Sequence, residues 1–93
     1  MSIRITHIRL ANGVRDHEHI SHVRWVAIGT GEVGSGTTSS VVVWIDDSNG
    51  RAYVGSGAEQ TQVGTVHPTG KPAYLRTYAD GAWSNNLLSL PTF

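Results

Sequence analysis

The chain of 93 residues contains no cysteine. Disulfide bonds, thiolate nucleophiles and sulfur-ligated metal sites are therefore excluded. A small domain that folds without disulfides is typical of a reducing compartment, so we expect a cytoplasmic protein. The first ten residues alternate isoleucine with arginine, and they lack the apolar core of a signal peptide.

The chain is also poor in charge, with 15% charged residues and a formal net charge of zero. General nucleic-acid binding normally requires excess positive charge, so we do not expect it here. The longest apolar run, Val41 to Ile45, is far too short to cross a membrane, and we expect no membrane partner. Six of the seven basic residues are arginines. Because a guanidinium binds phosphate or carboxylate with paired hydrogen bonds, local recognition of an anion stays open.

Residues that favour turns and β-branched residues are abundant, whereas charged residues are few. Hydrophobic residues make up 39% of the chain, which also has eleven glycines. These proportions predict one β-rich domain over residues 1–93, with a thin core. The glycine-rich stretch 29–40 is expected to be a mobile loop. Strands are expected at 2–10, 19–28, 51–54, 62–67 and 73–79, with a hairpin turn at Asp80–Gly81.

The first expected strand has an interrupted alternation. Ile3 and Ile5 share one face of an extended chain, whereas Ile8 and Leu10 share the other. Either both faces are partly covered, or a bulge near Thr6–His7 exchanges them.

The segment Val41–Ile45 can be interpreted in two ways. Its β-branched residues favour a buried strand. A helix is the alternative, because Ser39 or Ser40 could cap it and Val41, Trp44 and Ile45 would share one face. Propensity alone favours the strand.

The C-terminal motifs resemble a known family. Tyr74-Leu-Arg-Thr, then Ala79-Asp-Gly, then Asn86-Leu-Leu-Ser-Leu-Pro are similar to the tail of an uncharacterised family of small bacterial and phage domains, domain-of-unknown-function family 3892. The family has an aspartate before Asn86, where this chain has Asn85. Weaker similarity extends the resemblance over essentially the whole chain, at His19–Ile20, Trp25, Trp44–Ile45 and Tyr53–Val54.

The resemblance implies an α+β domain in which the Trp44 segment is a short helix, and it brings no activity with it. We therefore predict an α+β fold: a twisted antiparallel sheet of about five strands with one short helix. A thin core and unpaired sheet edges also predict a homo-oligomer.

Histidines are the first candidates for chemistry. His17, His19 and His22 lie within six residues, but at most two of them can converge locally on an extended chain. Zinc needs three or four converging ligands, so we expect strand and turn histidines, with no metal and no cofactor. The alternative is a small metal-dependent enzyme in which His17, His19 and His67 come together.

The best ligand-binding candidate is a set of three alternating residues. Tyr74, Arg76 and Tyr78 share one face of a strand, so two phenol rings would flank a guanidinium that could bind an anion. In the alternative interpretation the tyrosines pack internally and Arg76 pairs with Asp80. Further ligand contacts are expected from Asp80, Asn86 and Arg24, with Arg4 or Arg9 assisting.

These observations favour a non-enzymatic binding module that captures a small anionic ligand, such as a signalling nucleotide. The phage connection extends this hypothesis to an anti-defence sponge for a host immune nucleotide. The first alternative is an adaptor or inhibitor of a host protein, which would use an apolar edge or Trp83 and the Leu87–Phe93 tail. The metal-dependent enzyme is the second alternative.

Overall fold

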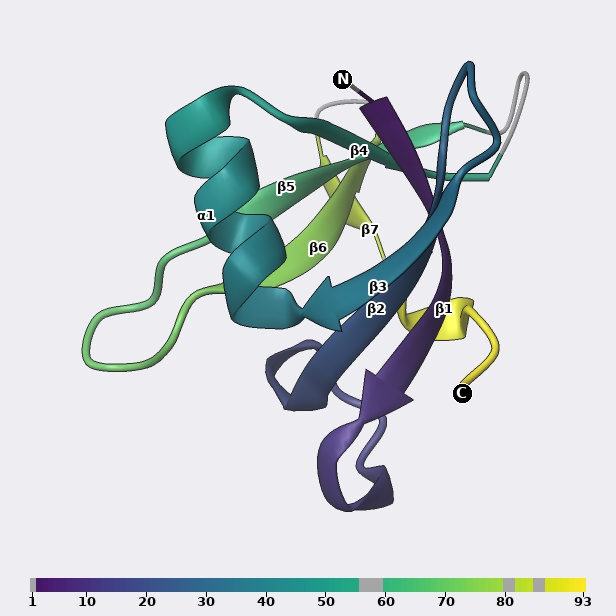
Figure 1. Ribbon diagram of the computed structural model, residues 1–93. Coiled ribbons are helices and arrows are strands. Elements are labelled where there is room, and N and C mark those ends of the chain that lie inside the picture. Colours follow the sequence, from purple (N-terminus) through teal and green to yellow (C-terminus); the bar gives the residue numbers. More distant parts are fainter. Residues whose placement is uncertain (1, 56–59, 80–81, 85–86) are drawn as a thin grey trace.

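The computed structural model describes residues 2–55, 60–79, 82–84 and 87–93 (Figure 1). It confirms the α+β fold class, with the helix α1 (Thr38–Ser48). Its short 3-10 turns are η1 (Ala11–Gly13), η2 (His17–His19) and η4 (Leu87–Ser89). Its strands are β1 (Ser2–Leu10), β2 (Ile20–Ala27), β3 (Val33–Thr37), β4 (Arg51–Val54), β5 (Thr61–Val66), β6 (Tyr74–Ala79) and β7 (Ala82–Ser84).

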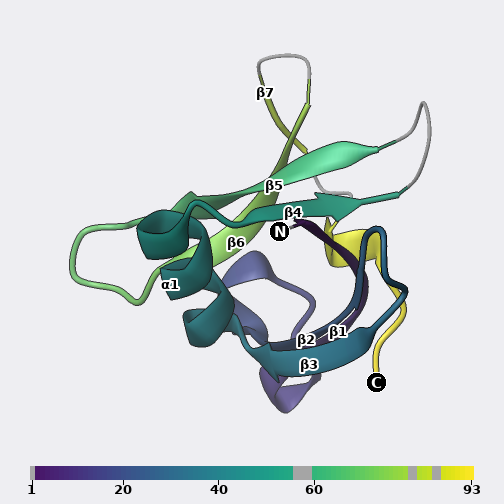
Figure 2. The same cartoon turned by 45° about the horizontal axis from the view of Figure 1, so that its top comes forward.

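The strands form a mostly antiparallel sheet in the order β3-β2-β1-β4-β5-β6-β7, in which β1 and β4 pair in parallel. Figure 2 shows how the sheet curls, so that β1, β2 and β3 face β4, β5 and β6 while α1 lies along one side. The apolar core fills the space between these elements. None of the helices in the described residues is long and apolar enough to cross a membrane.

A bulge in β1 resolves the interrupted alternation. The register against β2 shifts between Ile5 and His7, and the core-facing side changes parity there. As a result Ile3, Ile5 and Ile8 are all buried, each at most 3% exposed. The predicted bulge near Thr6–His7 is confirmed.

The segment Val41–Ile45, for which the sequence allowed either a strand or a helix, lies in the helix α1. The side-chain oxygen of Thr37 accepts a hydrogen bond from the Ser40 N–H (3.1 Å), so the cap lies before the two serines proposed for it. The helix ends at Asn49, which adopts a left-handed conformation with its N–H bonded to the Trp44 carbonyl. Burial of Val41 and Val42 outweighs their preference for strands, because tertiary packing supplies most helix stability in proteins.

The glycine-rich stretch was expected to be a mobile loop, and that expectation is wrong for residues 33–37, which form β3 at the edge of the sheet. Trp25 of β2 lies across this strand. A Cβ atom at Gly34 would lie 2.7 Å from Trp25 Nε1, and one at Gly36 would lie 3.3 Å from Cη2. The indole can therefore lie against β3 because these positions have no side chain, and it covers a strand that glycine alone would leave weakly packed.

The C-terminal segment completes β1. The strand β4 pairs only with residues 2–4 of β1. Further along, the Ile8 N–H donates to the Pro91 carbonyl (3.0 Å), and the Phe93 N–H donates to the Ile8 carbonyl (3.1 Å). Leu87 is fully buried in the core, whereas Phe93 lies against polar side chains of β1 and β2.

The contact between Trp25 and Gly34 makes a testable prediction. We expect Gly34→Ala to destabilise the protein by about 1–3 kcal/mol, because the new methyl group would collide with the indole. The free energy of unfolding in urea would measure this loss. In a Trp25→Leu background the same substitution should cost much less, and equal costs in both backgrounds would contradict the explanation.

Candidate functional site

Basic side chains gather on the outer face of β1 and β2, opposite the core. The antiparallel register places His7 opposite Arg24 and Arg9 opposite His22. Directly opposite residues in adjacent strands are close enough for their side chains to interact. Two strands thus bring together two arginines and two histidines that are separated in the sequence.

The C-terminal segment adds an aromatic ring to this face. The guanidinium carbons of Arg9 and Arg24 each lie 4.6 Å from the centre of the Phe93 ring, in the geometry of cation–π contacts. The His7 ring meets Phe93 edge-on, with 6.4 Å between ring centres. We call His7, Arg9, Arg24 and Phe93 the Arg–Phe cluster.

Neither arginine of the cluster forms an ion pair with an acidic side chain among the described residues. The ion pairs between described residues are His67–Asp46 and Lys71–Glu18, and neither includes an arginine of this face. Arg9 donates its Nε–H to the Phe93 carbonyl (3.0 Å), which leaves its other donors for a ligand. Because both guanidiniums contact one ring, their central carbons are separated by no more than twice 4.6 Å.

A hollow of about 360 Å³ adjoins the cluster. Arg9 and Phe93 line it together with Arg15, which is exposed and donates a hydrogen bond to the Leu88 carbonyl. Two guanidiniums therefore border one solvent-accessible hollow. The chemistry of this arrangement suits an anionic group. Arginine would bind it through charge-assisted hydrogen bonds, which are among the strongest hydrogen bonds in proteins.

The structure confirms that Tyr74, Arg76 and Tyr78 lie on one face of β6, because the intervening Leu75 and Thr77 are fully buried on the other face. Tyr78 is 45% exposed. Tyr74 and Arg76 are half-buried.

The turn η2 lies against this face. The His17 ring is 6.5 Å from the Tyr74 ring, centre to centre. Burial lowers the pKa of His17, and the nearby positive charge of Arg76 lowers it further, although Asp16 acts in the opposite direction. His17 is therefore expected to be uncharged at neutral pH, which spares the Arg76 guanidinium a second positive charge.

Arg24, another predicted ligand residue, does not lie beside Tyr74, Arg76 and Tyr78. Asp80, Asn85 and Asn86 lie outside the described residues. Arg24 belongs to the Arg–Phe cluster, and β1, β4 and β5 separate its strand from β6 in the sheet.

The candidate metal ligands do not converge. His17 and His19 lie in η2, whereas His67 follows β5 and contacts the Asp46 carboxylate of α1 at 2.8 Å. Asp46 also accepts a hydrogen bond from the Thr65 hydroxyl (2.8 Å), so it joins α1 to the end of β5. Within the described part of the chain, no three histidine or acidic side chains are placed to share a metal ion.

Sequence reasoning did not place Phe93 beside the arginines of β1 and β2, and named it only as part of the Leu87–Phe93 tail. No local signal could have placed this ring against two arginines, because Phe93 and Arg9 are 84 residues apart. The arginine-rich composition was the one indication in the sequence of a further candidate anion site away from β6.

Comparison with known proteins identifies the family. The family described as "Protein of unknown function (DUF3892)" matches residues 4–91, so the chain belongs to it. This match confirms the resemblance drawn from the C-terminal motifs. No curated protein and no solved structure matches the chain.

The environment of His17 predicts how stability depends on pH. Its folded-state pKa lies below the ordinary value of 6.5, so the unfolded chain takes up the proton more readily. The stabilising contribution is present above pH 6.5 and is lost as the pH falls towards the folded-state pKa. We expect His17→Gln to lose less stability than the wild type between pH 7.5 and 5.5 in urea unfolding.

A direct measurement complements this comparison. The His17 ring signals, followed by NMR against pH, should titrate below 6.5. Titration at or above that value, or identical pH dependence of the two proteins, would contradict the assignment.

Proposed function

We propose that this DUF3892 domain is a cytoplasmic, non-enzymatic binding module that captures a small anionic ligand at the Arg–Phe cluster. The observation that carries the proposal is the placement of Arg9 and Arg24 on one phenylalanine ring, where neither pairs with an acidic side chain among the described residues. An anion between the guanidiniums would replace their mutual repulsion with two attractions.

The phenylalanine ring also preorganises the arginines. A free arginine side chain loses considerable rotamer entropy when it binds a ligand. Contact with Phe93, and the hydrogen bond from Arg9 to its carbonyl, restrict this freedom in advance. Preorganisation of this kind favours affinity because less entropy is lost on binding.

Arg9 and Phe93 of the cluster line the adjoining hollow, whereas Arg24 does not, so the volume of the hollow concerns the part of a ligand that lies beside Arg9. Pockets for small molecules usually measure about 300–1,000 Å³, and the hollow of about 360 Å³ is near the lower end of that range. A phosphate-bearing metabolite or a mononucleotide suits this volume. A host defence nucleotide captured by a sponge is a narrower form of the same proposal, supported only by the ligand chemistry.

The face of β6 is the alternative anion site within this function. Tyr78 is exposed there and Arg76 lies beside it on the same strand face. The half-burial of Tyr74 and Arg76 and the contact with His17 reduce the room for a ligand. We therefore assign the primary site to the Arg–Phe cluster and test both.

Calorimetric titration with inorganic phosphate, AMP, a cyclic dinucleotide and citrate would test the proposal. We expect at least one probe to bind, and affinity to fall as salt rises from 50 to 200 mM. Arg9→Ala and Arg24→Ala should each weaken binding by about tenfold to a hundredfold, because each removes a charge-assisted interaction.

Arg51→Ala is the matched control, since Arg51 is an exposed arginine on β4 outside the cluster. It should leave binding unchanged. Loss of binding in Arg76→Ala alone would move the site to β6. Equal weakening in every arginine variant would show non-specific charge attraction and would overturn the assigned site.

A protein partner is the second candidate, favoured by the apolar end of the β2–β3 hairpin. Val33 is 67% exposed on the edge strand and Ile28 nearby is 46% exposed. An adaptor role and the expected homo-oligomer both remain predictions.

The oligomer can be tested directly. If self-association uses this edge, Val33→Lys should shift the sedimentation equilibrium towards the monomer, because a charge on an edge strand opposes pairing. A wild-type protein that is monomeric at all concentrations would contradict the oligomer.

A further inference from the structure

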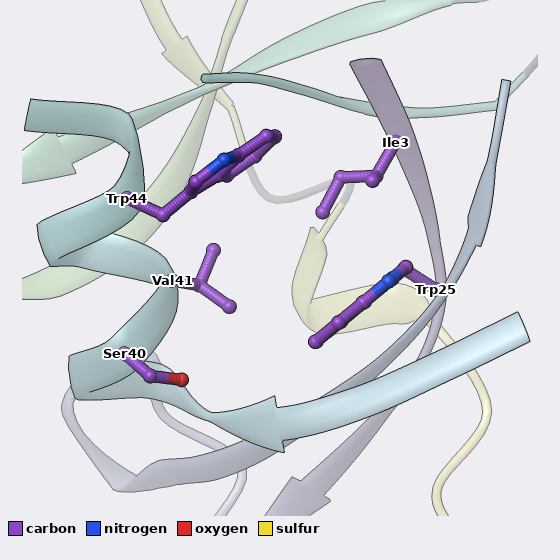
Figure 3. Close-up of a pocket in the computed structure, with 5 residues that line it drawn as sticks. All are labelled: Ile3, Trp25, Ser40, Val41 and Trp44. Carbon is purple, nitrogen blue, oxygen red and sulfur yellow. The ribbon is translucent and has the colours of Figure 1, made fainter. Parts of the chain in front are cut away.

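A second hollow lies on the core side of the sheet, between β2 and α1 (Figure 3). Its volume is about 150 Å³. Figure 3 shows Trp44 from the helix and Trp25 from β2 extending into this space from opposite sides. The lining residues are Ile3, Trp25, Ser40, Val41 and Trp44.

Main chain supports both indoles. Trp25 lies against Gly34 and Gly36 of β3, as described above. Trp44 lies against Gly50, where a Cβ atom would be only 2.3 Å from the ring carbon Cδ2. Close contact with backbone limits the movement of each ring away from the hollow, so the space between them is maintained by the fold.

The two indoles do not fill the space by stacking on each other. The aromatic ring contacts between described residues are His7–Phe93 and His17–Tyr74, and neither includes a tryptophan. Each indole is only partly buried, so part of its surface remains available. A planar group could therefore pack against the rings with little rearrangement.

Polar groups accompany the apolar walls. The Trp25 Nε1 lies beside Gly34 of β3, and in the described part of the chain no acceptor receives a hydrogen bond from the indole N–H of Trp25 or Trp44. The Ser40 hydroxyl donates to the Thr37 carbonyl (2.8 Å), which leaves its oxygen able to accept. Apolar surface with a few hydrogen-bonding groups is typical of small-molecule sites.

We propose that this hollow binds a single aromatic ring that carries a polar substituent, such as a phenol. The volume supports one ring, because an engineered apolar cavity of about 150 Å³ in another protein binds benzene. Aromatic pairs gain about 0.5–1.5 kcal/mol beyond burial alone, so the indoles favour an aromatic ligand over an aliphatic one of equal size.

The site is separate from the Arg–Phe cluster. Arg24 and Trp25 are consecutive residues of β2, and consecutive side chains of a strand point to opposite faces of the sheet. The two proposals can therefore fail independently. A neutral ring would occupy the core side, whereas an anion would occupy the outer face.

The test uses p-cresol as the probe and 2-naphthol as the larger comparison. In ¹⁵N-labelled protein, p-cresol should cause saturable shifts of the indole N–H signals of Trp25 and Trp44. These signals are assigned from Trp25→Phe and Trp44→Phe variants. 2-Naphthol should bind at least about tenfold more weakly, because its second ring exceeds the volume.

Ser40→Leu is the decisive variant, because its larger side chain would occupy the hollow from an exposed position on α1. We expect it to weaken p-cresol binding at least about tenfold while the unfolding midpoint is maintained or raised, because the leucine would fill part of the hollow. Val43→Leu is the control on the same helix: Val43 is 56% exposed, does not line the hollow, and its variant should bind normally.

Three results would overturn the proposal: no saturable shift with p-cresol, equal binding by Ser40→Leu, or equal affinity for 2-naphthol. Arg24→Ala should leave p-cresol binding unchanged. A loss in that variant would also contradict the separate site.

Discussion

The strand β1 changes its neighbour along its length, and both proposed sites depend on this change. Near its start it pairs in parallel with β4, and near Ile8 it pairs with the C-terminal segment. The bulge after Ile5 keeps isoleucines of both halves in the core. The first half contributes Ile3 to the hollow between Trp25 and Trp44. The second half holds Phe93 against Arg9 and Arg24.

This division gives the two faces of the β1–β2 pair different chemistry. On the outer face, hydrogen bonds between the tail and β1 fix Phe93, and the ring in turn restrains Arg9 and Arg24. On the inner face, glycines of the edge strand allow Trp25 to lie flat. On each face, main chain of a neighbouring segment therefore supports a side chain of a proposed site.

The sequence predicted those features that depend on local patterns. The alternation of isoleucines indicated the bulge, and the cap and apolar spacing made a helix possible, although the family resemblance was needed to decide it. The glycine-rich stretch was misjudged because Gly34 and Gly36 are turn formers in isolation, and only the distant Trp25 makes them part of a strand. Phe93 was misjudged for the same physical reason, since its partners are far away in the sequence.

The hollow between Trp25 and Trp44 lowers the stability of the fold, and this loss bears on its interpretation. At about 24 cal/mol per Å³, a dry cavity of about 150 Å³ would destabilise the fold by about 3–4 kcal/mol. A domain of this size has a total stability of roughly 5–15 kcal/mol, so this loss is substantial even if water in the open part of the hollow reduces it. A larger residue than serine at position 40 would fill the space without disturbing the cap, because Thr37 supplies the capping oxygen. The fold does not require the hollow to stay open, and the proposed ligand site would account for the space between the two supported indoles.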